Sequence, residues 1–186
     1  MLAILIVEDE PLLAGTLKDL VELNPLFTVT AIANDLDSAL AAVEARRPDL
    51  ALVDLQLANA TSGYSVAAKL HELGIACLLT TGQAPSFPVP DLAIGCLRKP
   101  FEEEDLVRAL TEAEDIIRGR EKLVRLRTKL PEQLQIYSAD AQRDDEAAAW
   151  VPGVRRRTSL RARLWKLVRR PSTFMSAAQA GHVADA

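Results

Sequence analysis

Residues 3–9 of the chain read Ala-Ile-Leu-Ile-Val-Glu-Asp, a run of five apolar residues that ends in two acids. The run lacks the alternating polar residues of a strand that has one face in water. A strand without them is covered on both faces, as in a parallel sheet. The stretch therefore predicts a buried parallel strand over residues 3–7, with Glu8 and Asp9 at its carboxyl end.

Four further short apolar runs follow, and amphipathic helical stretches separate most of them. This alternation is typical of β-α-β units. We therefore predict an α/β fold with a doubly wound, five-stranded parallel sheet. The four runs are Phe27–Ala33, Leu50–Val53, Ile75–Thr80 and Ala93–Leu97.

Three helices are predicted between the first four strands. The first begins at Pro11, which suits the first turn of a helix, and ends before Pro25. The second follows Asp35 and ends at Pro48, and the third spans residues 62–73. Each carries apolar residues at helical spacing, so each is expected to cover one face of the sheet.

The remaining two helices of such a fold are expected to be unusual. Residues 83–91 hold three prolines within six positions. Each proline inside a helix costs about 3 kcal/mol, so the fourth helix is predicted to be reduced to a loop. The fifth starts near Glu102, and its apolar stripe continues past Gly119. We predict an extended fifth helix that docks or forms a homodimer through residues 106–130.

Composition and charge suggest one acidic globular domain followed by a basic appendage. Hydrophobic residues make up 49% of the 186, which is typical of a protein with a packed core. Residues 1–120 hold 9 Lys and Arg against 19 Asp and Glu, whereas the rest hold 13 against 7. We predict a domain over 1–120, a helical extension over 121–130, and a linker with a basic, partly disordered tail over 131–186.

No segment of the sequence is typical of export. The first ten residues pass from a short apolar run into acids, without the basic start and cleavage site of a signal peptide. Cys77 and Cys96 lie in apolar runs without metal-like spacing, which indicates buried, reduced thiols. We expect a cytoplasmic protein.

Reactive side chains follow four of the five predicted strands. In an open parallel sheet such groups gather beyond the carboxyl ends of the strands. Three carboxylates, a hydroxyl and an ammonium are therefore expected to converge at one edge. They belong to Glu8 and Asp9 after the first strand, Asp54 after the third, Thr81 after the fourth and Lys99 after the fifth.

Carboxylates that lie close together repel one another unless a cation lies among them. A hard divalent ion with oxygen ligands, most naturally Mg²⁺, meets that need. The Asp54 carboxylate could then attack phosphorus while the metal and Lys99 stabilise the charge on the transferring phosphoryl oxygens. The residues thus predict a site that forms an acyl phosphate.

Taken in chain order, Val7-Glu8-Asp9, Val53-Asp54, Thr81-Gly82 and Lys99-Pro100 resemble the motifs of the response-regulator receiver family of two-component signalling. The resemblance covers residues 1 to about 120 and implies a flavodoxin-like receiver fold. It also implies that a sensor histidine kinase or a phosphotransfer protein donates a phosphoryl group. The phosphorylated protein would then change its binding to a downstream partner protein.

The resemblance further assigns roles to single residues. Asp54 would accept the phosphoryl group and bind Mg²⁺. Asp9 would bind the metal directly, Glu8 through water, and Gln56 through its backbone carbonyl.

The phosphoryl group would have its own partners. Thr81, helped by the Gly82 amide, would hydrogen-bond a phosphoryl oxygen, and Lys99 would pair with the group. The bond between Lys99 and Pro100 is expected to be cis.

The chain departs from the family pattern at two places. Receivers carry an aromatic side chain three residues before the lysine, where this chain has Cys96, and the loop from Asp54 to Gly63 lacks a common proline. The signal is therefore expected to reach the output surface by a different route. Residues 79–82, Leu-Thr-Thr-Gly, resemble a subset of stand-alone receivers with a Phe-Ala-Thr-Gly-like motif, without its Phe and Ala.

Other interpretations stay open. Asp54 taken alone could cap a helix or face solvent, and Thr80 competes with Thr81 for the hydroxyl role, although Gly82 favours Thr81. A Mg²⁺-dependent phosphatase would share the architecture but generally needs a second acid where this chain has Gln56. We therefore expect a signalling protein rather than an enzyme, one that catalyses only its own phosphoryl transfer and dephosphorylation.

The basic tail also has more than one interpretation. Residues 154–170 carry eight Lys and Arg and no acid, with apolar residues spaced for one helical face. A solvated, disordered tail is the default for such a segment. Contact with nucleic acid or an anionic membrane is the alternative, and with it a DNA-binding transcriptional regulator.

Overall fold

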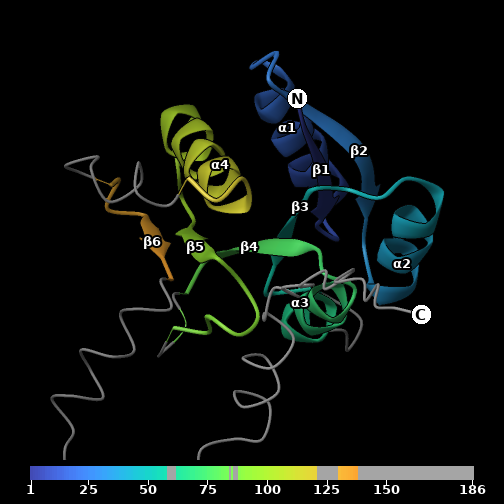
Figure 1. Cartoon of the computed structure of the whole chain (residues 1–186). Coiled ribbons are helices and arrows are strands. Elements are labelled where there is room, and N and C mark those ends of the chain that lie inside the picture. The colour runs from blue at the N-terminus through green and yellow to red at the C-terminus, as the bar shows by residue number, and fades with distance from the viewer. Residues whose placement is uncertain (58–61, 84, 86–87, 121–129, 138–186) are drawn as a thin grey trace, which may run out of the picture. The chain divides into compact units, whose positions relative to one another are not determined.

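A six-stranded sheet with helices on both faces forms the body of the protein (Figure 1). The computed structural model describes residues 1–57, 62–83, 85, 88–120 and 130–137. The strands lie in the order β2-β1-β3-β4-β5-β6, and the first five run parallel. The elements are β1 (Leu2–Val7), α1 (Pro11–Glu22), β2 (Phe27–Ala33), α2 (Leu36–Ala45), β3 (Leu50–Asp54), α3 (Gly63–Glu72), β4 (Ala76–Thr81), β5 (Gly95–Arg98), α4 (Glu103–Ile117) and β6 (Leu134–Ile136).

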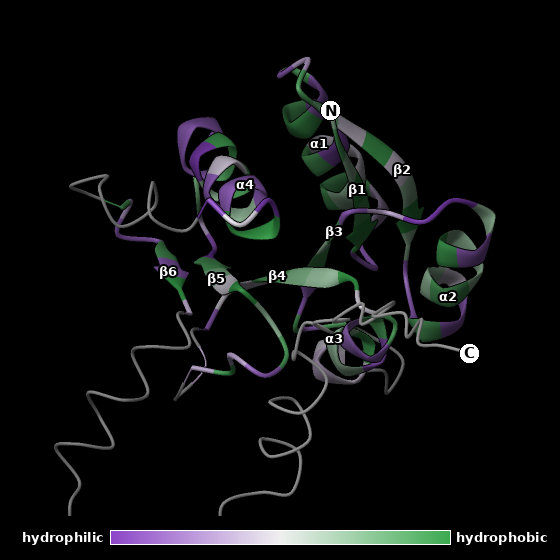
Figure 2. Cartoon of the chain, in the orientation of Figure 1, coloured by the Kyte–Doolittle hydropathy of each residue, from purple (hydrophilic) through white to green (hydrophobic). Residues whose placement is uncertain are grey.

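Two hydrophobic cores, one on each face of the sheet, hold this arrangement together. Side chains of α1 and α4 pack on one face, and those of α2 and α3 pack on the other. The aliphatic strands contribute to both cores by turning alternate side chains to opposite faces. Figure 2 shows that hydrophobic residues predominate along β1, β3 and β4. The predicted α/β, doubly wound fold is confirmed.

Local sequence signals set where the helices begin. Pro11 occupies the first turn of α1, where its missing amide costs nothing. The Asp35 side chain accepts a hydrogen bond from the Ser38 amide at 2.8 Å and so caps α2. Ser62 caps α3 by accepting from the amide of Tyr64. These starts place the loops that precede α1 and α3 at the carboxyl edge of the sheet.

The connection between β4 and β5 contains no helix among its described residues, 82–83, 85 and 88–94. Its end is a turn in which the Val89 carbonyl accepts hydrogen bonds from the amides of Leu92 and Ala93. The predicted loss of a fourth helix is confirmed for this part of the chain. The helix labelled α4 is therefore the one expected as the fifth.

The predicted count of five strands is wrong, because residues 134–136, expected in a linker, form β6. This strand pairs antiparallel with β5, with Cys96 opposite Gln135. A Cβ atom on Gly95 would lie 2.6 Å from the Gln135 carbonyl oxygen, so only glycine lets the two backbones come this close. A three-residue strand is too short to show a strand period.

Helix α4 ends earlier than the sequence suggested. Its last residue is Ile117, and Gly119 follows with a φ of 70°, so the helix does not run on unbroken. Leu130 packs against the core on the α1 and α4 face. The helical extension predicted over 121–130 otherwise falls on residues outside the described part of the chain, as does the basic segment 154–170.

None of the helices in the described ranges has both the length and the apolar character needed to cross a bilayer.

Both cysteines are free and buried, as predicted, and burial raises the pKa of each thiol, that of Cys77 to about 12. At pH 8 only about one Cys77 in ten thousand is then a thiolate, the form that reacts. We expect neither Cys77 nor Cys96 to be alkylated by iodoacetamide in the folded protein, and both to be alkylated in urea. Intact mass measures this, and native labelling at the rate of free glutathione would contradict it.

Candidate functional site

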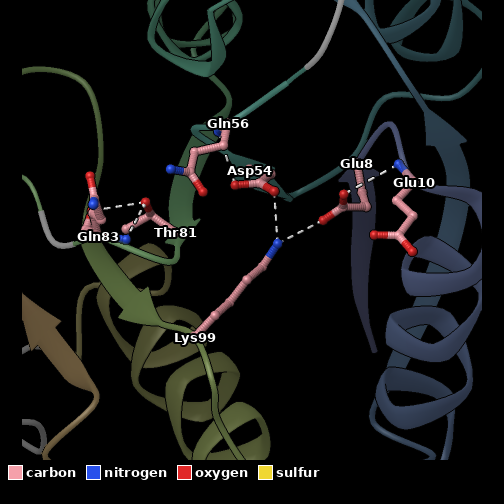
Figure 3. Close-up of polar contacts among 7 residues, drawn as sticks. All are labelled: Glu8, Glu10, Asp54, Gln56, Thr81, Gln83 and Lys99. Carbon is pink, nitrogen blue, oxygen red and sulfur yellow. Dashed lines mark hydrogen bonds and ion pairs between the residues drawn. The ribbon is translucent and has the colours of Figure 1, made fainter.

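The carboxyl edge of the sheet collects the polar side chains that follow its strands (Figure 3). Glu8 follows β1, Asp54 ends β3, Thr81 ends β4 and Lys99 follows β5. Strands β1, β3, β4 and β5 are consecutive neighbours in the sheet, and Asp54 lies opposite Thr80 in the register of β3 and β4. The sheet therefore brings four of the predicted site residues to one place.

Lys99 joins the two buried acids of this site. Its Nζ lies 2.7 Å from Asp54 Oδ2 and 2.9 Å from Glu8 Oε2. The side chains of Glu8 and Asp54 are only 3% and 7% exposed, and that of Lys99 is 20% exposed. Charges this deeply buried require partners, and one ammonium serves both carboxylates. The cluster keeps a net charge of −1.

The electrostatics of the cluster follow from this geometry. Burial raises the pKa of Glu8, and the hydrogen bond and charge of Lys99 offset only part of that rise. Burial lowers the pKa of Lys99, but the hydrogen bonds to Asp54 and Glu8 outweigh it, so the net shift is upward. Lys99 is therefore a cation throughout the neutral range.

Asp54 is held at three points. Oδ2 accepts from Lys99, and Oδ1 accepts from the Gln56 amide at 3.1 Å. Gly63 at the start of α3 lies directly against the backbone of Asp54: a Cβ there would overlap the Asp54 carbonyl oxygen and lie 2.6 Å from Leu55 Cα. The position of the carboxylate thus depends on a bare backbone at residue 63.

Replacing Gly63 by alanine is expected to lower the free energy of unfolding by about 2 kcal/mol, because the added methyl group meets backbone atoms that cannot move aside cheaply. Urea denaturation measures this. The matched control is Gly15→Ala in α1, where a Cβ meets nothing within 4 Å and alanine should stabilise the helix by about 0.5 to 1 kcal/mol. A Gly63 variant as stable as the control would contradict the close approach.

Of the two threonines at the end of β4, Thr81 presents its hydroxyl to the loop. Its Oγ1 donates to the Gln83 carbonyl at 2.8 Å and accepts from the Gln83 amide at 3.2 Å. Thr80 and Thr81 are each 1% exposed, and the Thr80 carbonyl accepts from the Leu55 amide. The structure therefore places the Thr81 hydroxyl at the site edge but on Gln83, not on Asp54.

Residues 4–111, more than half of the chain, match the family described as "Response regulator receiver domain". The chain belongs to the receiver family of response regulators. Receivers of this family are components of two-component regulatory systems, so the signalling class expected from the sequence is confirmed.

Curated relatives match a little more than half of the chain. The "Sensory transduction protein LytT" of Enterococcus faecalis is 32% identical in an alignment of 114 positions that covers 59% of this chain and 47% of the relative. The "Nitrate/nitrite response regulator protein NarL" of Escherichia coli K12 is 30% identical in an alignment of 121 positions that covers 59% of this chain and 53% of the relative. The chain spans about half the length of these relatives.

Solved receivers share the fold. A CheY-like receiver domain protein from Methanospirillum hungatei superposes with a TM-score of 0.55 at 26% identity, covering 66% of this chain and 98% of its own. The receiver domain of the PhyR response regulator from Erythrobacter litoralis gives a TM-score of 0.51 at 29% identity, covering 60% and 88%. The flavodoxin-like receiver fold predicted from the sequence is thus confirmed.

The donor set of this receiver suits Mg²⁺ by its chemistry. The net negative charge left after Lys99 is counted calls for a further cation, and the available ligands are carboxylate and carbonyl oxygens. Asp9 is half-buried beside Glu8 in sequence. Within the described ranges, however, no three or more His, Cys, Asp and Glu side chains are grouped so that they could hold a metal ion, and Lys99 pairs with both Glu8 and Asp54.

The structure also shows features that sequence reasoning missed. No sequence motif indicates the hydrogen bond between Thr81 and Gln83. The close approach of Gly63 to the backbone of Asp54 is also not indicated, because the two residues are nine positions apart in the chain. Receivers carry an aromatic side chain at the position that Cys96 occupies in this chain. Here the buried side chain of Tyr137 lies beside the Cys96 thiol. The cis bond between Lys99 and Pro100 was predicted and is present.

Proposed function

We propose that this receiver accepts a phosphoryl group on Asp54. The observation that supports this most is the double anchoring of the carboxylate, with Oδ2 on Lys99 at 2.7 Å and Oδ1 on the Gln56 amide at 3.1 Å. Both contacts hold the nucleophile at the end of β3, where a donor can reach it from the carboxyl edge of the sheet. The same lysine then lies within reach of the incoming group.

In the proposed step an oxygen of Asp54 forms a bond to phosphorus, and the bond from phosphorus to the donor breaks. The donor, a phosphohistidine imidazole or an acyl phosphate such as acetyl phosphate, leaves with the bonding electron pair. Lys99 stabilises the charge on the phosphoryl oxygens, while Glu8 keeps the ammonium in place. Thr81 would exchange the Gln83 carbonyl for a phosphoryl oxygen.

Mg²⁺ is proposed as the cofactor of this step. Asp9, Asp54 and the backbone carbonyl of Gln56 would hold it, with Glu8 contributing through water. The ion would neutralise charge between the carboxylates and the phosphoryl group. The support is the residual negative charge and the oxygen-rich set of ligands.

The donor is proposed to be a sensor histidine kinase or a phosphotransfer protein, and the output a change in binding to a downstream protein. A relative named "Protein-glutamate methylesterase/protein-glutamine glutaminase 2" matches this chain over only 31% of its length. We therefore do not propose the activities in its name for this chain. We propose that the chain catalyses only its own phosphoryl transfer and dephosphorylation, and that it acts in the cytoplasm.

The test is to incubate the protein with acetyl phosphate and Mg²⁺ and to follow its intact mass, with an excess of EDTA as the parallel sample. A mass gain of one phosphoryl group that depends on Mg²⁺ supports the proposal. A mass that stays unchanged with both the small donor and a panel of histidine kinases would refute it.

Two further proposals concern the residues after the predicted domain over 1–120, which are the predicted extension over 121–130 and the predicted tail over 131–186, although residues 134–136 of that tail form β6 of the sheet. DNA binding by the basic segment 154–170 is the alternative output, supported by its eight Lys and Arg without an acid. Salt-dependent DNA binding that is lost on removal of the segment would promote it. Dimerisation through residues 106–130 is tested by light scattering with and without phosphorylation.

A further inference from the structure

The edge of the sheet that carries Asp54 is strongly acidic. The four described helices all begin there, because each follows the carboxyl end of a strand, and three of them begin beside a group of acids. This acidic rim consists of residues 8–10, 35–37, 54 and 98–105, and it holds ten Asp and Glu against two Lys and Arg. A charged molecule that approaches the site therefore meets mostly negative side chains.

Cations of the described residues do not balance this charge. Residues 1–120 hold nine Lys and Arg, and seven of them lie within the helices or within three residues of their ends. Of the two in the acidic rim, Lys99 is shared by Glu8 and Asp54, and Arg98 lies 4.0 Å from Glu132. The acidic rim thus keeps an excess of negative charge.

Two parts of the acidic rim adjoin Glu8. The amide of Glu10 donates to Glu8 Oε1 at 3.3 Å (Figure 3). Asp35 follows Ala33 by two residues, and the Ala33 carbonyl accepts from the Glu8 amide at 2.9 Å. Hydrogen bonds from Ser38 lower the pKa of Asp35, so this carboxylate is charged throughout the neutral range. Both neighbours of Glu8 therefore add negative charge beside the proposed acceptor.

The third part of the acidic rim is the start of α4. Glu102 is three residues from Lys99, so their Cα atoms are at most about 11 Å apart. The distance over which salt screens a charge is about 10 Å at 0.1 M ionic strength and about 30 Å at 0.01 M. The acids at the start of α4 therefore act on the site when the ionic strength is low.

The structure of α4 explains only some of these acids. Asp105 accepts a hydrogen bond from the Glu102 amide at 3.1 Å and so closes the first turn of the helix. Glu103 and Glu104 lie between them and are exposed, and neither forms a side-chain hydrogen bond or ion pair with a residue that the structure describes. Their charges are therefore directed at the solvent beside the site.

Phosphodonors differ in the charge that they bring to such a surface. Acetyl phosphate is a small dianion near pH 7, whereas a phosphohistidine is presented by a protein, whose surface can surround it with cations. Like charges slow association and opposite charges accelerate it, and salt weakens both effects. The same acids should therefore have opposite effects on the two kinds of donor.

We propose that Glu103 and Glu104, together with the other acids of the acidic rim, select the phosphodonor by its charge. They slow transfer from small free anions and accelerate transfer from a phosphohistidine that lies on a positively charged protein surface. The inference rests on the proposed phosphorylation of Asp54 and specifies the class of donor for that step. Glu103 and Glu104 act through their charge alone and do not touch the reacting atoms.

The first test replaces both acids in the full chain, as Glu103→Gln together with Glu104→Gln. Intact mass follows labelling by acetyl phosphate at saturating Mg²⁺. At an ionic strength of about 0.03 M the double variant should be labelled about threefold faster than the wild type. At about 0.5 M the two rates should be equal, because the charges are screened. Equal rates at both ionic strengths would overturn the inference.

The matched control is Glu44→Gln together with Glu72→Gln, which removes the same charge from the exposed ends of α2 and α3 at the opposite edge of the sheet. This control should be labelled as fast as the wild type. A gain as large as that of the Glu103 and Glu104 variant would show that only the net charge of the protein matters. The selection by the acidic rim would then be wrong.

A second small donor separates charge from structure. Phosphoramidate is mainly a monoanion near pH 7, so the Glu103 and Glu104 double variant should gain less than about twofold with it. An equal gain with both donors would indicate that the substitutions altered the site itself, and this would overturn the inference.

The second test uses a protein donor, the phosphorylated histidine kinase that labels the wild type fastest in the panel described above. At low ionic strength the transfer to the Glu103 and Glu104 double variant should be about threefold slower than to the wild type. Transfer that is unchanged or faster would overturn the inference.

These outcomes separate the inference from the proposed function. If Asp54 is labelled at the same rate in every variant, the proposed function stands and the selection by charge falls. If no donor labels the wild type, both fall. Circular dichroism establishes that the variants are folded. Should the Glu103 and Glu104 variant fail to fold, the wild type still decides, because labelling by acetyl phosphate that does not rise with ionic strength overturns the inference.

Discussion

Asp54→Asn is expected to abolish the phosphoryl mass gain from acetyl phosphate and Mg²⁺ while leaving the fold intact. Asparagine keeps the shape of the side chain and an oxygen for the Gln56 amide, but its amide is too weak a nucleophile to form an acyl phosphate. Labelling should fall at least a hundredfold, to the limit of detection. Intact mass after a fixed incubation measures the change.

The matched control is Asp37→Asn, which removes an exposed carboxylate in the first turn of α2. It should be labelled as the wild type is. Circular dichroism establishes that the Asp54 variant is folded. Equal labelling of Asp54→Asn and the wild type would mean that another residue accepts the phosphoryl group.

Lys99→Met is expected to have the largest effect on stability at the site. It leaves the buried carboxylates of Glu8 and Asp54 without their shared cation. Loss of one partner of a buried ion pair typically lowers the free energy of unfolding by about 3 to 5 kcal/mol. We expect about 3 kcal/mol, the lower end of this range, because the Lys99 side chain is partly exposed. Urea denaturation at pH 8 measures the loss, and Mg²⁺ should restore part of it.

The pH dependence of this loss has a definite sign. The pKa of Lys99 is raised above 10.5, so its stabilisation is present below pH 10.5 and is lost as the pH rises through the higher folded value. Burial raises the pKa of Glu8, so this carboxylate loses its charge as the pH falls through that raised value, and the gap between variant and wild type should then shrink. A gap as large at about pH 3 as at about pH 8 would contradict this account.

Lys18→Met provides the surface comparison. Lys18 lies 4.0 Å from Glu22 on α1, and both side chains are well exposed. Exposed pairs of this kind contribute about 0.5 kcal/mol or less. The difference between the two lysine variants isolates the effect of burial.

Much of the fold could be predicted because its signals are local. Continuous aliphatic runs such as residues 3–7 are typical of strands covered on both faces, and Pro11 and Asp35 mark helix starts. The prolines between residues 85 and 90 predicted the loss of a helix, which is confirmed for the described residues of this connection, 82–83, 85 and 88–94. The convergence of the site residues could then be predicted, because the carboxyl ends of parallel strands lie at the same edge of a sheet.

The rest depends on contacts between residues far apart in the chain. β6 has three residues, and it is held by pairing with β5 and by packing of Leu134 in the core, so no local pattern indicates it. Tyr137 lies beside Cys96 because of that pairing alone. The position of the Thr81 hydroxyl on Gln83 depends on the loop conformation, which residue types do not determine.

The place of β6 at the border of the sheet also bears on where the chain can be cut. A boundary at residue 120, suggested by the sequence, would remove β6 and leave unpaired those amides and carbonyls of β5 (Gly95–Arg98) that face away from β4. Bare strand edges recruit other chains and promote aggregation. A soluble fragment of this protein should therefore retain the residues through 137, so that β6 of the same chain, and not a strand of a neighbouring molecule, pairs with β5.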